Sequence, residues 1–396
     1  MMFSRSHALI LTIPLRLKLQ AGRVVCRTVT STAKPRELND GFAVRSRLDV
    51  PEKGTPAPRI AGRKWLPGST FQGHELPEFL AGPKDNMPAV YEAVGTGLTL
   101  REWSDRCRRI MDDKLHVYGT ILFRGLPLES GDDFSRFFRE VGYRVANPAG
   151  RIGRRREVAS DVFTASDNNP PAYTLEPHNE MAYTKNYPMK IFFYCQVPAE
   201  PGQGGETCIA DNRDILPRLD PKVVQKFEKL GIKYHYYVAS KAVDKDAYLS
   251  WQSTFGSEDK AVVEECLREQ ECEYKWQEDD SLIYWRYRPP FITHPKTGEK
   301  VWFNQLVVGH VSYYFDHPAW VDKKLPYERY PENVYYGDGS EIEPEVIQHI
   351  RDVTWQETVG FQLQKGDVLA FDNIYAHHGR IGFDCERVLY VGMTSE

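Results

Sequence analysis

The residues best suited to chemistry are two histidines and a carboxylate in two separate segments. His178 and Glu180 stand two apart in PHNEMAY, residues 177–183, and His377-His378 lies near the end of the chain. In a strand, residues i and i+2 point to the same face. Two imidazoles and one carboxylate form the facial triad of non-haem Fe(II) oxygenases, which leaves positions open for oxygen ligands. The pair alone is weak, because 11 His and 55 acidic residues produce such pairs by chance.

Two further segments strengthen this interpretation through their order along the chain. Gly204-Gly205-Glu206-Thr207 follows the first pair, and Arg387 follows the second. A planar guanidinium can clamp the free carboxylate of a dicarboxylate co-substrate, and a Thr hydroxyl can add a hydrogen bond. Read alone, the Gly-Gly pair can also be only a turn.

Together these segments resemble the TauD/TfdA family of Fe(II)/2-oxoglutarate-dependent dioxygenases, and more narrowly the plant clavaminate-synthase-like proteins. The resemblance covers about residues 95–396, and its segments are collinear. The matching stretches are LFRGLPL (122–128), PPAYTLEPHNEMAY (170–183), GGET (204–207), WQSTF (251–255), KVWFNQ (300–305), YGDG (336–339) and GDVLAFDNIYAHHGRIGFDCERVL (366–389).

The resemblance implies a role for each matching residue. It makes His178, Glu180 and His378 the Fe(II) ligands and hence the catalytic residues. The family spacing, Asp-Asn and then four residues before the His, selects His378 over His377. Thr207 and Arg387 resemble the residues that contact 2-oxoglutarate. Asn304 is expected to line the substrate pocket, and Arg380 to be a supporting residue.

Two positions depart from the commoner family pattern. Glu180 stands where most members of the family have Asp. Clavaminate synthase and its plant relatives also have Glu at this position. A carboxylate is still present, which argues against a halogenase, where a small residue would leave room for halide. Val391 stands four residues after Arg387, where many relatives carry a second Arg, so any contact made by that Arg is absent.

The function implied is hydroxylation of a small polar metabolite, with conversion of 2-oxoglutarate and O₂ to succinate and CO₂. Desaturation or ring closure stays open, because the same ligands serve those reactions. A jelly-roll protein that binds metal without catalysis is the other alternative, and the intact ligand set counts against it. The Arg/Tyr-rich stretch 284–288, YWRYR, hints at a small polar or anionic substrate.

The elements around these residues are expected to be mainly strands with flanking helices. Helices are predicted at 99–114, where Thr99 and Glu102 form a capping box, and at 134–141, 221–230, 259–269 and 343–354. Strands are predicted at 117–123, 190–197, 232–238, 301–308, 360–364, 367–371 and 387–393. Many strands with a few helices favour an antiparallel barrel or jelly roll. The resemblance narrows this to the double-stranded β-helix of the clavaminate-synthase type.

The first 36 residues differ in composition from the rest. They contain seven basic residues and no acidic one, although the whole chain carries a net charge of −4. This pattern is typical of a transit peptide, so we expect a mitochondrial location, with a plastid or another organelle as alternatives. A secretory signal and a disordered tail are the rival interpretations. Residues 37–94 are expected to be an extended lead-in, and 95–396 the oxygenase domain.

Composition also limits the partners. The acidic body argues against nucleic acid, and the basic run 151–156 is expected to be a loop or a local anion contact. No apolar run is long enough to span a bilayer. The seven Cys contain no CxxC, which favours free thiols in a reducing compartment. We therefore expect a small-molecule substrate, no nucleic acid and no membrane, with a homo-oligomer left open.

Overall fold

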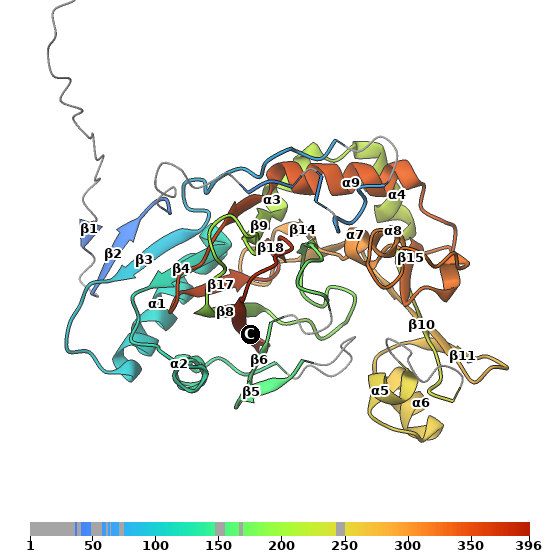
Figure 1. The fold of residues 1–396 in the computed structure, drawn as a ribbon, viewed down its shortest axis with the longest axis horizontal. Helices are drawn as coiled ribbons and strands as arrows, with labels where there is room; N and C mark the ends of the chain where they lie inside the picture. Colours follow the sequence, from blue (N-terminus) through green and yellow to red (C-terminus); the bar gives the residue numbers. More distant parts are fainter. Residues whose placement is uncertain are drawn as a thin grey trace, which may run out of the picture. The chain divides into compact units, whose positions relative to one another are not determined.

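Two antiparallel sheets carry most of the strands in the computed structural model (Figure 1). The structure describes residues 36–37, 41–48, 58–60, 62–63, 65–70, 75–146, 155–165, 169–242 and 250–396. All of them belong to one unit, Pro35–Glu396. The expected transit peptide lies outside the described residues, except for Arg36.

The larger sheet has nine strands in the order β1-β2-β3-β4-β17-β8-β19-β6-β5. Their bounds are β1 Arg36–Glu37, β2 Phe42–Arg45, β3 Ala89–Ala93, β4 Thr120–Arg124, β5 Glu157–Ala159, β6 Val162–Thr164, β8 Lys190–Val197, β17 Val368–Asp372 and β19 Val388–Thr394. All pairs are antiparallel except β3 with β4. The segment expected to be only a lead-in thus supplies three strands to this sheet.

The smaller sheet has four strands in the order β16-β9-β18-β7. Their bounds are β7 Leu175–His178, β9 Thr207–Asp211, β16 Val359–Phe361 and β18 Ala376–Arg380. One apolar cluster joins the two sheets, with Ile191 and Phe193 from the large sheet and Ile209 and Phe361 from the small one. Two antiparallel sheets that bury a common core form a jelly roll, as the sequence predicts.

Two helices cover the other face of the large sheet (Figure 1). They are α1 Leu100–Tyr118 and α2 Gly131–Val141. The predicted capping box is present, since Thr99 and Glu102 bond each other's backbone N–H groups. Phe134, Phe137 and Phe138 of α2 are almost fully buried in the same cluster as Phe192 and Tyr194 of β8. These contacts hold the strands that frame the candidate site.

A third sheet lies in the long connection between β9 and β16, and we call it the insert sheet. Its order is β11-β12-β10-β15, with β10 Ile232–Val238, β11 Glu273–Trp276, β12 Leu282–Arg288 and β15 Glu332–Tyr336. Helices precede, interrupt and follow it: α3 Asn212–Ile215, α4 Pro221–Leu230, α5 Trp251–Phe255, α6 Lys260–Glu269, α7 Leu306–Gly309, α8 Ser312–Phe315 and α9 Pro344–Glu357. The hairpin of β13 Phe291–Thr293 and β14 Lys300–Trp302 also lies in this connection. One cluster buries residues of the sheet together with Met181 and Tyr183, just after the candidate ligands.

Two predicted strands differ from the structure. The segment 117–123 begins as the end of α1, because Gly119 at φ 72° ends the helix and β4 starts only at Thr120. The segment 301–308 splits after Trp302, because Asn304 Oδ1 accepts the Leu306 N–H and the chain turns into α7. The predicted strands 190–197 and 232–238 match β8 and β10.

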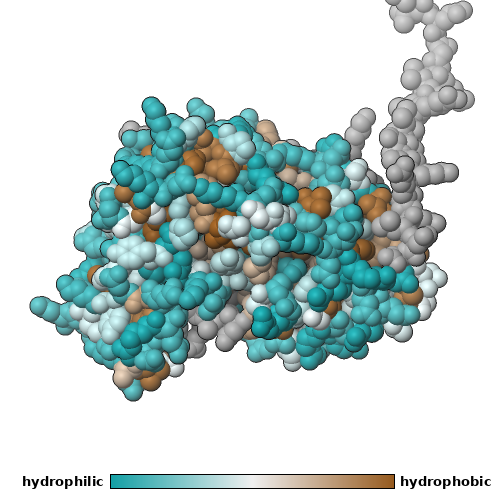
Figure 2. Space-filling model, turned by 180° about the vertical axis from the view of Figure 1, so that it is seen from behind, coloured by the Kyte–Doolittle hydropathy of each residue, from teal (hydrophilic) through white to brown (hydrophobic). Residues whose placement is uncertain are grey.

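No described helix is both long and apolar enough to cross a bilayer. On the face in Figure 2 hydrophilic residues predominate, and apolar residues form small separate patches.

Candidate active site

The three side chains predicted as metal ligands lie together between the jelly-roll strands. His178 ends β7 and pairs directly with His378 of β18, and the ring centroids are 4.5 Å apart. Glu180 Oε2 lies 3.7 Å from His178 Nε2 and 3.5 Å from His378 Nε2. All three residues are buried, and one ligand atom from each lies within 4.8 Å of the others. A single ion could therefore contact all three.

The backbone around Glu180 is fixed by Asn373, the Asn of the Asp-Asn motif, and by Asn179. Asn373 Oδ1 accepts the Glu180 N–H at 2.8 Å, and Asn373 Nδ2 donates to the Glu180 carbonyl at 2.9 Å. Asn179 Nδ2 donates to the Asn373 carbonyl at 2.6 Å. Met181 follows with φ 55°, a left-handed conformation that is costly for a side chain of this kind. The Asp-Asn motif before His378 thus holds the loop that carries Glu180.

The Glu180 carboxylate uses its two oxygens differently. Arg155 Nη2 donates to Oε1 at 3.0 Å, while Oε2 faces both imidazoles. Both side chains are buried. The basic run thus supplies a local anion contact through Arg155. Because one oxygen is taken by Arg155, the carboxylate is set up to give a metal only one ligand atom.

Different contacts prepare the two imidazoles. His178 Nδ1–H donates to the Glu176 carbonyl at 2.8 Å, so Nε2 is the ring nitrogen that faces the centre. Burial, with a further contribution from His178, lowers the pKa of His378 to about 4. Phe193 and Phe371 pack against the His378 ring at 5.2 and 5.6 Å between centroids. Neutral imidazoles and one carboxylate fit Fe(II), so the residues present match the ion that the triad implies.

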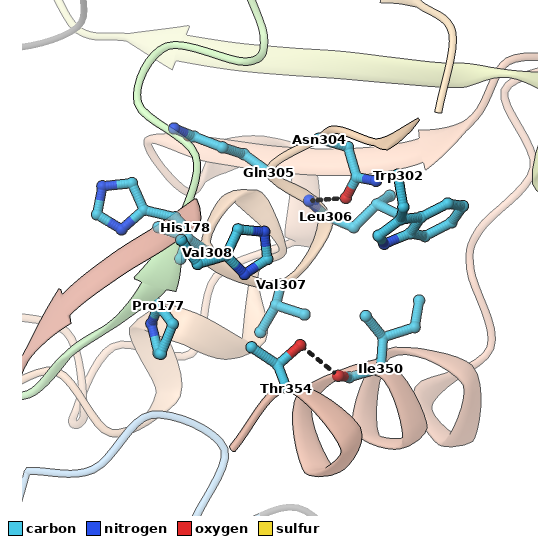
Figure 3. Close-up of a pocket in the computed structure, with 11 residues that line it drawn as sticks. Pro177, His178, Trp302, Asn304, Gln305, Leu306, Val307, Val308, Ile350 and Thr354 are labelled. Atoms are coloured by element: carbon cyan, nitrogen blue, oxygen red, sulfur yellow. Dashed lines mark hydrogen bonds between the residues drawn. The ribbon is translucent and has the colours of Figure 1, made fainter. Parts of the chain in front are cut away.

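His377 points away from this group, as alternation along β18 requires. It lines a small cavity together with Pro177, Asn304 and Thr354, and neither of its ring nitrogens has a hydrogen-bond partner among the described residues. Figure 3 shows this cavity between the end of β7, the segment after β14 and α9. Asn304 reaches the cavity, but its amide bonds the backbone of Pro290 and Leu306. This amide is therefore already engaged in a turn.

A second cavity holds the residues predicted to bind 2-oxoglutarate. Thr207 and Arg387 line it together with His178 and His378. Arg387 Nη2 donates to Thr207 Oγ1 at 3.3 Å. Burial lowers the Arg387 pKa to about 10, and no described carboxylate forms an ion pair with it. A buried guanidinium without an acidic partner, beside the candidate metal ligands, fits a dianionic co-substrate.

The Gly-Gly pair has a packing role beyond that of a turn. Gly205 has φ 75°, and a Cβ there would lie 2.9 Å from Arg387 Cδ and 2.7 Å from Ala199 Cβ. A side chain at this position would displace the Arg387 stem. Arg380 lies in the same cavity, where its Nη1 donates to the Pro171 carbonyl at 2.7 Å. It therefore supports the segment leading to β7, as the resemblance implies.

A buried ion pair that the sequence did not reveal supports β7 from behind. Arg351 of α9 donates from Nε to Glu176 Oε1 at 2.8 Å, and from Nη2 to Ser312 Oγ at 2.8 Å. The side chains of Arg351 and Glu176 are 0% and 1% exposed. Since the Glu176 carbonyl orients His178, this pair links α9 to a candidate ligand.

Comparisons with known proteins agree with this geometry. The family model for "Taurine catabolism dioxygenase TauD, TfdA family" matches residues 84–393. The dapdiamide synthesis protein DdaC of Enterobacter agglomerans is 32% identical over 285 residues, 72% of this chain and 84% of that protein. A clavaminate synthase-like protein of Arabidopsis thaliana, At3g21360, is 31% identical over 286 residues, 71% and 82% of the two chains. PvcB of Pseudomonas aeruginosa, a solved structure, gives a TM-score of 0.46 at 13% identity over 91% of this chain and 93% of its own, too low to bear on function.

Proposed function

The chain belongs to the TauD/TfdA family of Fe(II)/2-oxoglutarate-dependent dioxygenases, and from this premise we propose a role for each residue of the site. His178, Glu180 and His378 hold the ferrous ion, and Arg387 with Thr207 holds the distal carboxylate of 2-oxoglutarate. The observation that supports this most strongly is the convergence of three buried ligand atoms within 4.8 Å, beside a buried guanidinium that forms no ion pair with a described carboxylate.

The ferrous ion, when bound, supplies the redox chemistry that couples decarboxylation of 2-oxoglutarate to oxidation of a substrate. The chain's own residues prepare for this chemistry in three ways. His178 and His378 turn Nε2 toward Glu180 Oε2, and Arg155 occupies the other oxygen of Glu180. Three protein ligands leave coordination positions open on one side of the ion. Phe193 and Phe371 keep water from the His378 ring.

Among the reactions of this family, the one proposed for this protein is hydroxylation of a small polar metabolite. The support comes from the family and from the polar groups around the site. Desaturation or ring closure is the second candidate, because the ligand set is compatible with both outcomes. The products formed from an isotopically labelled substrate would separate the two reactions.

The test of this proposal is an anaerobic titration with Fe(II) and then 2-oxoglutarate. We expect one equivalent of Fe(II) to bind and a weak visible charge-transfer band to appear when 2-oxoglutarate is added. In air, slow conversion of 2-oxoglutarate to succinate should follow without added substrate. If neither the band nor succinate appears in a folded protein, the proposed function is wrong.

We also propose that residues 1–36 direct the protein to mitochondria, with a plastid or another organelle as the alternatives. The support is their basic, acid-free composition. A fusion of residues 1–36 to a fluorescent protein should accumulate in mitochondria, and a diffuse signal would contradict the assignment.

A further inference from the structure

One face of the insert sheet carries buried polar groups, some of which have no hydrogen-bond partner among the described residues. Tyr236 of β10 pairs with Tyr284 of β12 and with Glu332 of β15, and Tyr234 pairs with Arg286. Paired residues of antiparallel strands share a face, and so do residues two apart. All five side chains therefore lie on the same face of the sheet.

This face lies against the loop that carries the candidate metal ligands. The Tyr183 ring is 6.2 Å from the Tyr234 ring and 6.0 Å from the Tyr236 ring. The Tyr234 hydroxyl accepts the Gln305 N–H, and Gln305 Nε2 donates to the Asn179 carbonyl at 2.6 Å. The face is thus tied directly to the His178–Glu180 segment.

Arg286 is buried and forms no ion pair with a described carboxylate. It is 1% exposed, and its guanidinium lies 5.6 Å and 5.5 Å from the ring centroids of Tyr183 and Tyr236. Its Nη2 donates to Gln270 Oε1 at 3.3 Å, while Nε and Nη1 have no acceptor in the described ranges. Aromatic faces attract the charge but do not replace hydrogen-bond acceptors. Leaving two such donors unsatisfied costs stability, which calls for an anionic or carbonyl acceptor at this position.

Tyr236 and Glu332 add a hydroxyl and a carboxylate to this group. The Tyr236 hydroxyl is buried and has no partner in the part of the chain that the structure describes. Glu332 is only partly buried, accepts the Tyr314 hydroxyl at 2.8 Å and forms no ion pair with any described cation. Burial raises the Glu332 pKa to about 7, and the His178 imidazole opposes that rise. A cationic group near Glu332 would keep its carboxylate charged.

Tyr236 lies between the positively charged Arg286 and the carboxyl group of Glu332. Burial raises its pKa well above the usual value, and Arg286 and Glu332 then act on it in opposite directions. Because β10 separates β12 from β15 and the two residues are offset by two positions along the strands, the backbones of Arg286 and Glu332 are about 12 Å apart. The face therefore offers a positive end, a hydroxyl and a negative end in sequence.

We propose that Arg286, Tyr236 and Glu332 form the substrate-binding site, and that the substrate is a zwitterion such as an amino acid or a short peptide. The substrate carboxylate accepts from Arg286 Nε and Nη1 and from the Tyr236 hydroxyl. The substrate ammonium donates to Glu332, which lies on the side of His178. This inference rests on the proposed function, because it places the substrate beside the same metal centre.

The experiment uses the full chain with Fe(II) and 2-oxoglutarate and a compound panel sorted by charge. The panel holds amino acids and dipeptides, together with matched amines that lack the carboxylate and matched acids that lack the ammonium. Compounds that raise succinate formation above the uncoupled rate should be zwitterions, and their binding is then measured by anaerobic calorimetry. Stimulation only by compounds that lack one of the two charges would overturn the inference. So would a panel without stimulating zwitterions in a protein that still forms the charge-transfer band, whereas loss of the band would contradict the proposed function instead.

Two variants test the residues themselves. Arg286→Gln should weaken binding of the best zwitterion by about tenfold or more. The zwitterion should then bind no more tightly than its methyl amide, which lacks the carboxylate. Glu332→Gln should abolish the tighter binding of this zwitterion relative to the matched acid that lacks the ammonium. The band reports whether each variant still forms the metal centre, and Arg268→Gln and Glu328→Gln, both exposed, are the controls. If both variants keep the two preferences, Arg286 and Glu332 do not bind the charged groups.

Discussion

The metal centre and the insert sheet place polar groups in opposite ways. Around the metal centre, described side chains hold one another: Asn373 fixes Glu180, Arg155 takes one carboxylate oxygen, and Glu176 orients His178. On the insert sheet, Arg286 and Tyr236 keep buried donors without partners among the described residues. Apart from His378 Nδ1, which has no hydrogen-bond partner among the described residues, the first region lacks only an ion and its co-substrate. The second is complete only when a ligand supplies acceptors.

The metal centre carries the chemistry that the family shares, whereas the insert sheet carries the polar groups that would select this protein's substrate. A metal centre must have its geometry before the ion arrives, so its supporting hydrogen bonds lie within the protein. A substrate site must discriminate between molecules, and unpaired buried polar groups do so by penalising any ligand that leaves them unsatisfied. The predictions below test each side of this comparison.

The largest effect is expected at the metal centre itself. His378→Ala should abolish the charge-transfer band and reduce succinate formation by about three orders of magnitude, more than the 10–100-fold typical of groups that only support a ligand. His377→Ala should keep the band, because His377 faces the other cavity. The reverse result, with the band lost only in His377→Ala, would show that the neighbouring histidine is the ligand.

The buried ion pair behind β7 should dominate stability. Arg351→Met leaves the Glu176 carboxylate buried without its cation, which should lower the free energy of unfolding by about 3–5 kcal/mol. Arg218→Met removes a partly exposed pair with Glu357 and should cost less than about 1 kcal/mol. Denaturant titrations measure both values, and equal losses would contradict the structural role of Arg351.

The co-substrate clamp should give a smaller and more selective effect. Arg387→Lys keeps a charge but loses the planar fork, so the KM for 2-oxoglutarate should rise by about 10–100-fold, with the Fe(II) affinity unchanged. Initial rates of succinate formation against 2-oxoglutarate concentration provide the measurement. An unchanged KM would remove Arg387 from the clamp.

The smallest effect is a pH dependence on the opposite face of the insert sheet. Burial lowers the His235 pKa to about 4, so the unfolded chain takes up a proton first as the pH falls. His235 should therefore contribute stability above its usual pKa of 6.5, and about 2 kcal/mol of this should be lost as the pH falls to about 5. His235→Gln should remove that part of the pH dependence. If the free energy of unfolding changes equally with pH in the wild type and in His235→Gln, His235 is not the group responsible.

The sequence predicted much of the jelly roll because local signals agreed with the fold. Thr99 and Glu102 mark a helix start, and the apolar run 190–197 is consistent with a strand buried on both faces. It failed at 117–123 and 301–308, where one glycine and one asparagine side chain redirect the backbone. The spacing of apolar residues does not predict such local changes of backbone direction.

The candidate site was predicted in part, for a related reason. The three ligands and Arg387 recur at family spacings, so they could be identified from type and order. Arg155, Asn373 and Arg351 could not, because their roles depend on contacts between segments far apart in the sequence. The stretch 284–288 hinted at a polar substrate, but only the pairing of β10 with β12 and β15 shows which of its residues share a face.

The central claim, one ferrous ion held by three side chains, is tested most directly by anaerobic crystals grown with Fe(II) and measured at the iron absorption edge. The account predicts a single anomalous peak within coordination distance of His178 Nε2, His378 Nε2 and Glu180 Oε2, with Glu180 Oε1 still bonded to Arg155. A peak bound by His377, or no peak between these residues in iron-loaded protein, would contradict it.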